Sequence, residues 1–363
     1  MRHRVAGSVL AESLLVSLAI AHTSSPQLRE SRRAQSPSQR QSTQPGVTFA
    51  RGDVTQPQFE EKIKALFLSF LCVNKTVIIF NPAAGSEQVE RWRERVESIV
   101  QGNGLFTTSR SGEAETLARR AADNGFEKIV AAGGDGTVNE VVNGLVGSEA
   151  ALGLLPMGTV NVFAMELGLP AHNLERCWDI IQDGNTRLVD LPSANGKYFV
   201  QLAGVGLDAQ VVKETSLTFK RSFGPLSYLI SAAQIAARQP PRLFIESENA
   251  SIDEGSFVLV GNGRLYGGPF PFFKHAVIDD GLFDVVVFKR LGYLEIIKYL
   301  QDVVFSSDIR VPEIEYFQTR HLRITSEQDV PVELDGELVG SCPVDFQIRE
   351  KAVRVLAPAI SSS

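Results

Sequence analysis

Residues Gly133 to Thr137 place three glycines, an aspartate and a threonine between an apolar run and a helical pattern. Glycine costs conformational entropy and buries little surface, so a chain that uses it here needs its main chain to approach something closely. Main-chain N–H groups at the start of a helix bind anions, and phosphate is their natural ligand. Asp135 would repel a phosphate unless a divalent cation lay between them. The motif indicates nucleotide phosphates bound with Mg²⁺, and a simple tight turn is the alternative.

Two further segments have a similar character. The sequence "LLPMGTVN" has Gly158 and Thr159 at a turn that follows an apolar strand, and "IIFNPAAG" ends another strand at Asn81. The P-loop pattern GxxxxGK[ST] and the dinucleotide pattern GxGxxG are both absent from these turns. The carboxyl ends of parallel strands meet at the edge of the sheet where such folds bind ligands, so we expect the three turns to converge on one site.

The elements around these turns alternate between apolar strands and amphipathic helices, which predicts a parallel α/β sheet with right-handed connections. Strands are expected where apolar runs end in turns, and helices where apolar residues recur every three to four positions. The expected strands are 75–82, 105–110, 128–133 and 151–156. The expected helices are 87–100, 113–125 and the segment that follows Thr137.

The second half of the chain consists mainly of extended runs separated by turns, at 186–204, 242–247, 256–262, 281–289, 321–326, 330–337 and 343–349. The Asn-Gly pair at 195–196 is a hairpin signal between two such runs. Two helical segments interrupt them, around Tyr228–Arg238 and Tyr293–Val304. We therefore predict an α/β domain over residues 72–188 and an antiparallel β-rich domain over residues 189–342.

The composition bounds the class of protein. The chain has 363 residues, of which 44% are hydrophobic and 21% charged, as in a globular protein of two domains. Its formal net charge of −6 provides no basic field for nucleic acid, so no nucleic-acid partner is expected. The three cysteines lie far apart without a CxxC pair, so neither a disulfide framework nor a zinc site is predicted.

The N-terminal residues 1–58 differ from the rest. They begin with a basic segment and an apolar stretch from Leu14 to Ala21, a pattern that resembles a secretory signal. A segment rich in Ser, Gln, Arg and Pro follows, and residues 22–58 are expected to be disordered because they cannot build a core. Two interpretations stay open: an export signal or anchor, or an upstream start codon that adds a leader without function.

Taken together, "NPAAG", "GGDGTVNEVVNGL", "LGLLPMGTVN" and "LDGE" resemble the catalytic domain of the diacylglycerol kinase family, in its bacterial soluble lipid-kinase branch related to sphingosine kinases. The resemblance extends from about Lys75 to Pro358. It implies a phosphofructokinase-like α/β nucleotide-binding domain plus a β-sandwich, as in NAD kinases, with the nucleotide in the cleft between them. It also implies that residues 343–358 return to complete the first domain.

The resemblance assigns the site residue by residue. The glycine-rich loop would cradle the ATP phosphates, with Asp135 near the catalytic Mg²⁺, and the polar residues after the other strands would hold the nucleotide. The residues implied to bind ATP are Asn81, Thr108, Gly133, Gly134, Asp135, Gly136, Thr137, Gly158 and Thr159.

Glu337 in "LDGE" matches the family's proposed proton acceptor, and with Asp135 it completes the implied catalytic pair. Phosphoryl transfer is mainly positioning and charge neutralisation, but the attacking hydroxyl must still lose a proton to a base. From the residues alone, Glu337 reads as an ordinary hairpin residue, because Asp335 and Gly336 form a good turn signal. Asp190 matches an acidic site residue of some relatives, or makes a structural hydrogen bond.

The segment "VIDDGLFD" offers carboxylates and carbonyl oxygens, which are the ligands of a hard cation. In the family a structural Mg²⁺ is held there, which implies main-chain oxygens from Val277 and Leu282 and the carboxylate of Asp280. A solvated acidic turn is the alternative. Two departures from the family pattern stand out: Ser86 replaces a lysine, for which Arg110 is a candidate substitute, and Val162 replaces an aspartate.

The implied activity is transfer of the γ-phosphate of ATP to a lipid hydroxyl, of diacylglycerol or a sphingoid base, in phospholipid metabolism. The alternatives are a kinase with a soluble acceptor such as NAD, and a nucleotide-binding regulatory module without turnover. The segment "RLYGGPFPFF" lines an acyl pocket, rests on a bilayer or folds onto the core. Because ATP is scarce outside the cytoplasm, we expect a cytoplasmic catalytic domain with peripheral contact to the inner membrane face. A homodimer is compatible with the sequence.

Overall fold

The computed structural model describes residues 75–82, 89–100, 102–206, 239–248, 250–292, 295–296 and 312–359, which belong to one compact unit. The leader of residues 1–58, Ser86 and the helix expected around Tyr228–Arg238 lie outside the described residues, as does the helix expected around Tyr293–Val304 apart from residues 295–296.

The first lobe is built on four parallel strands in the order β2-β1-β3-β4. They are β1 (Thr76–Phe80), β2 (Gly104–Thr107), β3 (Lys128–Gly133) and β4 (Ala151–Pro156). Every residue of β1 and β4 is buried, as expected for strands covered on both faces. The four strands predicted from the apolar runs are confirmed.

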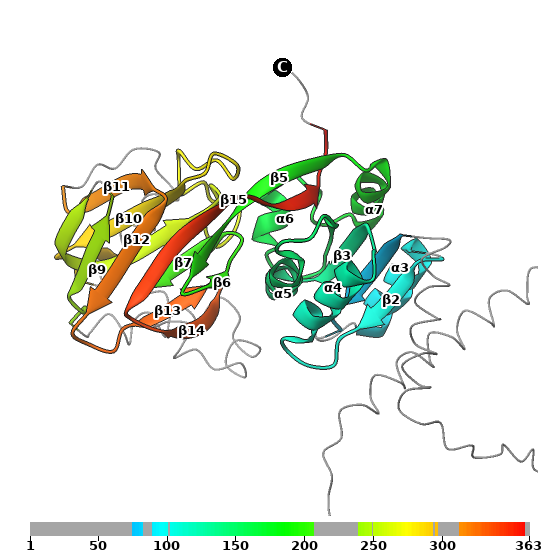
Figure 1. Cartoon of the computed structure of the whole chain (residues 1–363), viewed down its shortest axis with the longest axis horizontal. Helices are drawn as coiled ribbons and strands as arrows, with labels where there is room; N and C mark the ends of the chain where they lie inside the picture. The colour runs from blue at the N-terminus through cyan, green and yellow to red at the C-terminus, as the bar shows by residue number, and fades with distance from the viewer. Residues whose placement is uncertain are drawn as a thin grey trace, which may run out of the picture. The chain divides into compact units, whose positions relative to one another are not determined.

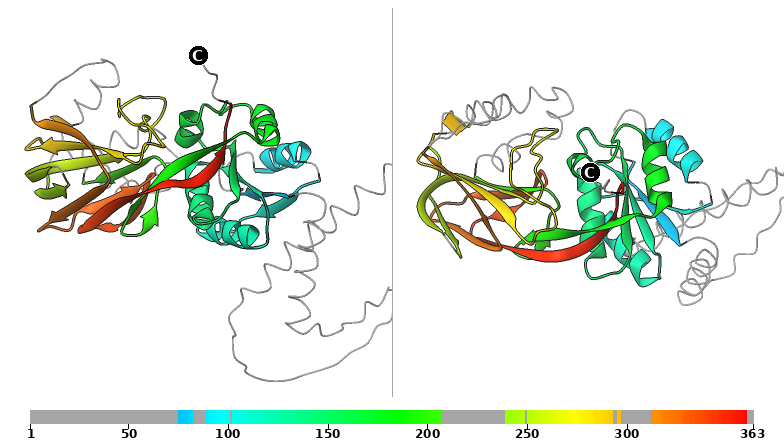
Figure 2. Two further views of the ribbon diagram at one scale, coloured as in Figure 1. Left: turned by 45° about the horizontal axis from the view of Figure 1, so that its top comes forward. Right: turned by 90° about the horizontal axis from the view of Figure 1, so that it is seen from above.

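The helices of this lobe lie against the sheet (Figures 1 and 2). They are α3 (Val89–Ile99), α4 (Glu113–Asp123), α5 (Asp135–Leu145), α6 (Val162–Glu166) and α7 (Leu174–Asp183). Gly144 lets α5 pack closely on α4, since a Cβ there would lie 2.4 Å from the Glu115 carbonyl oxygen. Helix α7, whose start is capped by Asn173, was not predicted from the sequence.

The second lobe is antiparallel, and its strands enclose an apolar core that includes Phe199, Phe283 and Phe346. The predicted hairpin at 195–196 is confirmed, with both residues at positive φ. Two strands, β11 and β14, were not predicted. The strands are β6 (Lys197–Tyr198), β7 (Leu202–Val205), β8 (Leu243–Ser247), β9 (Ser251–Gly261), β10 (Phe283–Lys289), β11 (Ile314–Thr319), β12 (His321–Ser326), β13 (Pro331–Leu334) and β14 (Glu337–Ser341).

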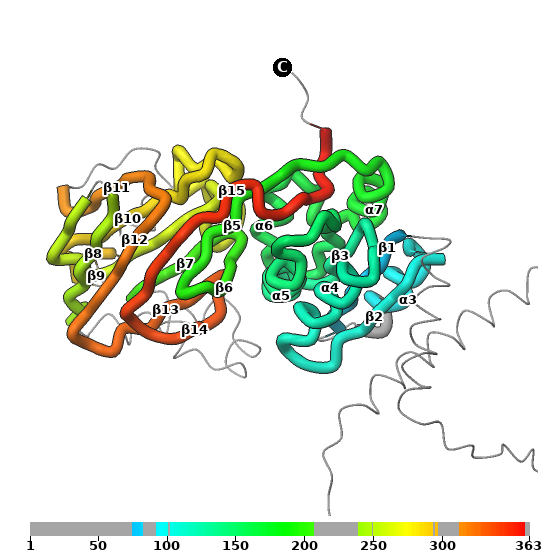
Figure 3. The backbone as a smooth tube through the Cα atoms, viewed as in Figure 1, coloured from blue at the N-terminus to red at the C-terminus, as the bar shows by residue number. Residues whose placement is uncertain are grey.

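Two long strands, β5 (Thr186–Ala194) and β15 (Val344–Leu356), run side by side through both lobes (Figures 1 and 3). One end of β15 pairs with β12, and the other pairs in parallel with β4, where Arg354 is opposite Ala151. The C-terminal strand is therefore part of the first lobe's sheet as well as the second's. This strand pair fixes how the described parts of the two lobes meet at the site.

Candidate active site

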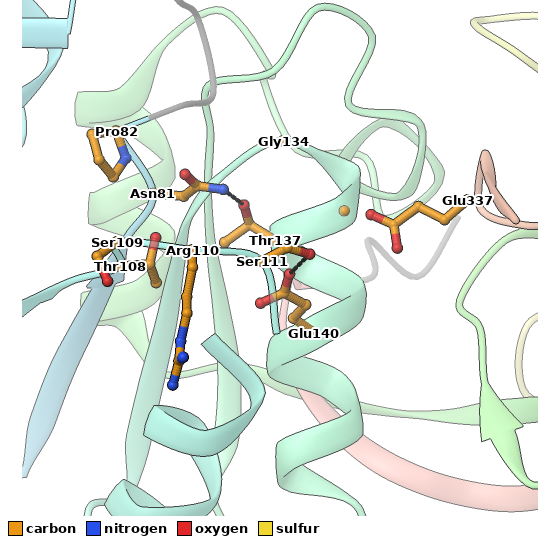
Figure 4. Close-up of a pocket in the computed structure, with 11 residues that line it drawn as sticks. Asn81, Pro82, Thr108, Ser109, Arg110, Ser111, Gly134, Thr137, Glu140 and Glu337 are labelled. Atoms are coloured by element: carbon orange, nitrogen blue, oxygen red, sulfur yellow. Dashed lines mark hydrogen bonds between the residues drawn. The ribbon is translucent and has the colours of Figure 1, made fainter. Parts of the chain in front are cut away.

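A pocket of about 330 Å³ lies where β1, β2 and β3 end and α5 begins (Figure 4). Its walls come from three loops of the first lobe and from one residue of the second, Glu337. The lining residues are Asn81, Pro82, Thr108, Ser109, Arg110, Ser111, Gly134, Gly136, Thr137, Glu140 and Glu337. Segments far apart in the sequence therefore converge on one edge of the sheet.

The glycine-rich loop leads directly from β3 into α5, and Gly134 is the N-cap of that helix. A Cβ on Gly133 would lie 2.4 Å from Thr137 Oγ1, and one on Gly136 would lie 3.1 Å from Glu337 Oε1. Glycine is thus required at 133 by the Thr137 side chain, whereas at 136 it gives the Glu337 carboxylate room close to the start of α5. They leave the first main-chain N–H groups of α5 accessible from the pocket, where an anion would be stabilised.

The turn after β4 packs directly on the glycine-rich loop. A Cβ on Gly158 would lie 2.6 Å from the Gly134 Cα, so both residues must be glycine for the two loops to touch. Asn161, at φ 59°, holds Gly158 on both sides: its Oδ1 accepts from Gly158 N at 2.8 Å and its Nδ2 donates to Gly158 O at 2.9 Å. Thr159 is exposed and is not among the residues that line the pocket.

Asp135 connects these two loops. Its Oδ1 accepts a hydrogen bond from Phe163 N at 3.4 Å, at the start of α6, and its side chain is not part of the pocket wall. Burial raises the pKa of the Asp135 carboxyl, while the neighbouring N–H groups of Val162, Phe163 and Asn161 lower it. The carboxylate therefore acts first as an acceptor that ties the β3 loop to the β4 loop.

Asn81 and Thr108 lie on the opposite wall of the pocket. Asn81 Nδ2 donates to Thr137 Oγ1 at 2.9 Å, which connects the end of β1 to the first turn of α5. The main chain of Thr108 donates to Phe80 O at 2.9 Å, so the residues after β2 continue the sheet into the pocket. The structure thus brings Asn81, Thr108 and Thr137 together as predicted neighbours.

The loop between β2 and α4 supplies one whole side of the pocket and is held by Glu140 of α5. Glu140 Oε1 accepts from Gly112 N at 2.8 Å and from Ser111 Oγ at 3.3 Å, and its Oε2 accepts from Ala114 N at 3.0 Å. Sequence reasoning missed Glu140, although a glutamate among the inward-facing valines of α5 was the signal. Arg110 is the cation among the described pocket residues, but its side chain extends away from Gly134 (Figure 4).

Glu337 begins β14, directly after a turn formed by Asp335 and Gly336 at φ 48° and 84°. Its carboxylate points towards the first turn of α5 (Figure 4), although the residue as a whole is exposed. Partial desolvation raises the pKa of Glu337, Lys197 lowers it, and the charges of Glu140 and Asp335 raise it further. A carboxylate with a raised pKa next to an anion-binding loop is suited to accept a proton.

The acidic loop at 277–282 lies beside β5, away from this pocket's lining. Asp280 Oδ1 accepts from Leu282 N at 3.0 Å, and Val277 O accepts from Asp280 N at 3.4 Å. Burial raises the pKa of the Asp280 carboxyl, and the charges of Asp190 and Asp279 add to the effect. The described residues contain no group of three or more His, Cys, Asp or Glu side chains placed to hold a metal, so any cation here would rely on main-chain oxygens.

Asp190, in contrast, makes structural hydrogen bonds. Its fully buried carboxylate accepts from Gly281 N at 2.6 Å and from Lys351 N at 2.5 Å. It therefore ties the acidic loop to the bulge in β15, where Lys351 has φ 49°.

The aromatic segment after β9 divides into two parts. Phe272 and Phe273 are buried in a core cluster with Phe257 and Phe288, which fits the interpretation that the segment folds onto the core. Phe270 is 39% exposed.

The comparisons agree with this geometry. Residues 75–194 match the model of the "Diacylglycerol kinase catalytic domain", and residues 201–357 match that of the "YegS C-terminal NAD kinase beta sandwich-like domain". A diacylglycerol kinase of Staphylococcus haemolyticus is 31% identical over 289 residues, which cover 77% of this chain and 87% of that protein. The chain belongs to the diacylglycerol kinase family.

Other relatives support the same assignment. A diacylglycerol kinase of Bacillus subtilis is 29% identical, with 77% of this chain and 95% of that protein covered. The crystal structure of a diacylglycerol kinase from Bacillus anthracis has the same fold, with a TM-score of 0.61, 22% identity, and coverage of 78% of this chain and 97% of that chain. The predicted family and the fold class of an α/β domain plus a β-sandwich are confirmed. Among the described residues, no helix is long and apolar enough to cross a membrane.

Proposed function

We propose that this member of the family transfers the γ-phosphate of ATP to the hydroxyl of a diacylglycerol-type lipid. The observation that carries the proposal is the position of Glu337. Its Oε1 lies against Gly136, in the turn whose N–H groups open α5 towards the pocket. The proposed proton acceptor and the N–H groups at the start of α5, which suit an anion, therefore face the same pocket from two sides. Transfer of a phosphoryl group to an alcohol requires both at one site.

In the proposed step, the lipid hydroxyl oxygen forms a bond to the γ-phosphorus while the bond to the bridging oxygen of ADP breaks. The hydroxyl proton passes to Glu337. The glycine-rich loop, together with Asn81, Thr108 and Thr137, holds the nucleotide, and Gly158 supports the loop from behind. Thr159 is proposed to contact the nucleotide outside the lining of the described pocket.

Mg²⁺ is the proposed cofactor, and it neutralises the charge of the phosphates when bound. Asp135 is the proposed protein partner of the nucleotide's Mg²⁺, since its carboxylate adjoins the phosphate loop and its raised pKa reflects a site where added positive charge is favourable. For a second, structural Mg²⁺, the all-oxygen loop of Val277, Asp280 and Leu282 suits a hard cation. The crowding of Asp190 and Asp279 around Asp280 supports this assignment.

A lipid acceptor needs apolar surface next to the loops that hold ATP. Two exposed apolar side chains provide it: Val160 is 37% exposed and Phe270 is 39% exposed. Both flank Gly268, since a Cβ there would lie 4.0 Å from Val160 Cγ1 and 3.1 Å from the Phe270 ring. We propose that acyl chains rest on this pair when the enzyme meets the inner membrane face.

Glu166 holds the aromatic segment that contains Phe270, and so supports the proposed contact with acyl chains. Its side chain is only 5% exposed, and its carboxylate accepts from Leu265 N at 3.0 Å and from Gln201 Nε2 at 3.2 Å. The short helix α6 therefore meets the Asp135 carboxylate at its start and holds the aromatic segment at its end.

The test is transfer of label from γ-labelled ATP with Mg²⁺. Diolein in anionic vesicles, sphingosine in the same vesicles, and NAD in solution are offered separately to the wild type and to Glu337→Gln. We expect phosphatidate from diolein with the wild type and a strong loss with the variant. Transfer to NAD alone would replace the lipid acceptor with a soluble one. Binding of ATP without any transfer would point to a regulatory module.

A further inference from the structure

The turn that carries Glu337 is held by a carboxylate of its own. Asp335 precedes Glu337 by two residues, and its side chain accepts four hydrogen bonds. Oδ1 accepts from Gln201 N and Leu202 N, both at 3.0 Å, and Oδ2 accepts from Val200 N at 2.8 Å and Asn139 Nδ2 at 2.7 Å. The Asp335 main chain adds a bond to Leu202 O at 2.8 Å. All the acceptor positions of an ionised carboxylate are in use.

The fourth donor comes from the other lobe. Asn139 lies on α5 and is 8% exposed, and its Nδ2 also donates to Tyr198 O at 3.2 Å. Asn143, one turn later, donates to the same Tyr198 O at 3.0 Å and accepts from Tyr198 N at 3.1 Å. The two asparagines therefore fasten α5 to the β6 segment, but only Asn139 reaches the turn before Glu337.

The same helix begins at the phosphate loop. Gly136 is in its first turn and touches Glu337 Oε1, whereas Asn139 is in the next turn and bonds to Asp335. Glu337 itself is exposed, so burial of its side chain does not fix its position. The position of its carboxylate follows from the turn. The turn is held by the Asp335 bonds, together with the bond from Gly336 N to Glu333 Oε2 at 2.6 Å and the pairing of β13 with β14.

We propose that Asp335 and Asn139 are positioning residues that hold the Glu337 carboxylate at the start of α5. The inference rests on the proposed function, in which Glu337 accepts the proton. In the proposed function the start of α5 binds the phosphates, and Asn139 of the same helix bonds to the turn before Glu337. The position of the proton acceptor relative to the phosphate site is therefore set by one rigid helix. A displacement of about 1 Å between reacting groups is enough to lower a rate about a hundredfold.

The chemistry of the contact suggests a specific variant. Asn139→Asp keeps the shape of the side chain but sets a second carboxylate against Asp335, which replaces a donor with an acceptor. Asp335→Asn in the otherwise wild-type chain tests the same contact from the other side, because an amide nitrogen in place of Oδ2 would face the Val200 N–H and Asn139 Nδ2 donors. Asn143→Ala is the comparison variant: Asn143 bonds to the same Tyr198 and donates to Asn139 Oδ1 at 3.0 Å, but its removal leaves in place the Asn139 Nδ2 donor to Asp335.

The experiment measures kcat and KM for MgATP on diolein vesicles, together with Tm. We expect Asn139→Asp to lower kcat by about 10- to 100-fold, as for a lost hydrogen bond to a charged group. The KM for MgATP should stay close to that of the wild type. Asp335→Asn should lower kcat to a similar extent, and Asn143→Ala should lower Tm with little change in kcat. Equal kcat losses in Asn139→Asp and Asn143→Ala, or a wild-type kcat in Asp335→Asn, would overturn the proposal.

A second measurement separates this inference from the proposed function. Hydrogen exchange of residues 198–202 and 333–341 is followed in all four proteins, with no acceptor present. We expect faster exchange of the turn in Asn139→Asp and near wild-type exchange there in Asn143→Ala. If the wild type phosphorylates no lipid, the proposed function fails, while exchange still decides whether Asn139 holds the turn. The same exchange in both variants would reject that role.

Discussion

The two sides of the pocket are built in different ways. On the phosphate side, the chain packs closely where a Cβ would not fit: the Gly134 main chain against the Gly158 main chain, and Gly133 against the Thr137 side chain, in turns that follow neighbouring strands. On the acceptor side, Glu337 comes from a distant hairpin that is fixed by side-chain hydrogen bonds. One of these, from Asn139 to Asp335, spans 196 positions of the chain.

This difference predicts which substitutions each side tolerates. The phosphate side depends on the absence of a Cβ, so added volume should disrupt it more than a change of polarity. The acceptor side depends on donors and acceptors in a fixed arrangement, so isosteric changes of hydrogen-bonding character should disrupt it without any change in volume.

The largest effect is expected at the acceptor side, from Glu337→Gln. The amide keeps the shape of the side chain but cannot accept the hydroxyl proton, so kcat should fall by about 10² to 10⁴-fold. The KM for MgATP and the Tm should change little, because the Glu337 side chain is exposed. Steady-state rates with labelled ATP and a thermal melt test both statements. A kcat within a few-fold of the wild type would show that the proton leaves by another route.

The next effect is expected at the phosphate side, from Gly158→Ala. The new methyl group would meet the Gly134 Cα at 2.6 Å, which is main chain and cannot rotate away. We expect a loss of about 1–3 kcal/mol in the free energy of unfolding and a higher KM for MgATP, since the phosphate loop must shift.

Gly104→Ala is the matched control for that substitution. Its Cβ would lie 3.4 Å from Val77 Cγ2, an ordinary contact, and it belongs to a strand outside the pocket lining. Denaturant unfolding and calorimetric titration of MgATP compare the two variants. Equal affinities for MgATP in both would contradict the role given to the contact between glycines.

A smaller effect is expected from Glu140→Gln, which acts on the loop of residues 108–112. One amide oxygen cannot replace the two carboxylate oxygens that accept from Gly112 and Ala114. The KM for MgATP should rise by about tenfold, in line with a hydrogen bond to a charged group. Glu115→Gln is the control, because it removes the same charge from an exposed ion pair with Arg119. If both variants raise KM alike, the loop is not held by Glu140.

The comparison also explains how far the sequence alone could go. The strands and the glycine-rich turns were predicted because their signals are local: apolar runs, and glycines at strand ends. Residues Asn81, Thr137 and Gly158 were placed in one site because parallel strands end at the same edge, whereas Thr108 was assigned by resemblance to the family. Resemblance to the family, rather than residue pattern, was needed to select Glu337 from an ordinary hairpin turn.

What the sequence could not show was the role of long-range side-chain contacts. The prediction of helix α5 used only its apolar positions. Its polar residues Asn139, Glu140 and Asn143 bond to partners in other elements of the chain. Asp135 was predicted as a metal partner, but the direction of its carboxylate towards α6 depends on the packing of two loops. The strand β14 was not predicted because the feature that identifies it as a strand is its pairing with β13, which the sequence does not show.

The smallest expected effect concerns the pH dependence of kcat and tests the electrostatics of the acceptor side. Glu337 must be ionised to accept a proton, so kcat should fall as the pH drops through the pKa of Glu337, which lies above the ordinary value of 4.5. Lys197 lowers that pKa, so Lys197→Met should move the acid limb of the profile to higher pH. Glu140 raises it, so Glu140→Gln should move the limb to lower pH. The Lys197 effect should shrink as salt is added, because its side chain is exposed. If the acid limb of the pH profile moves in the same direction in both variants, a group other than Glu337 governs the pH dependence of kcat.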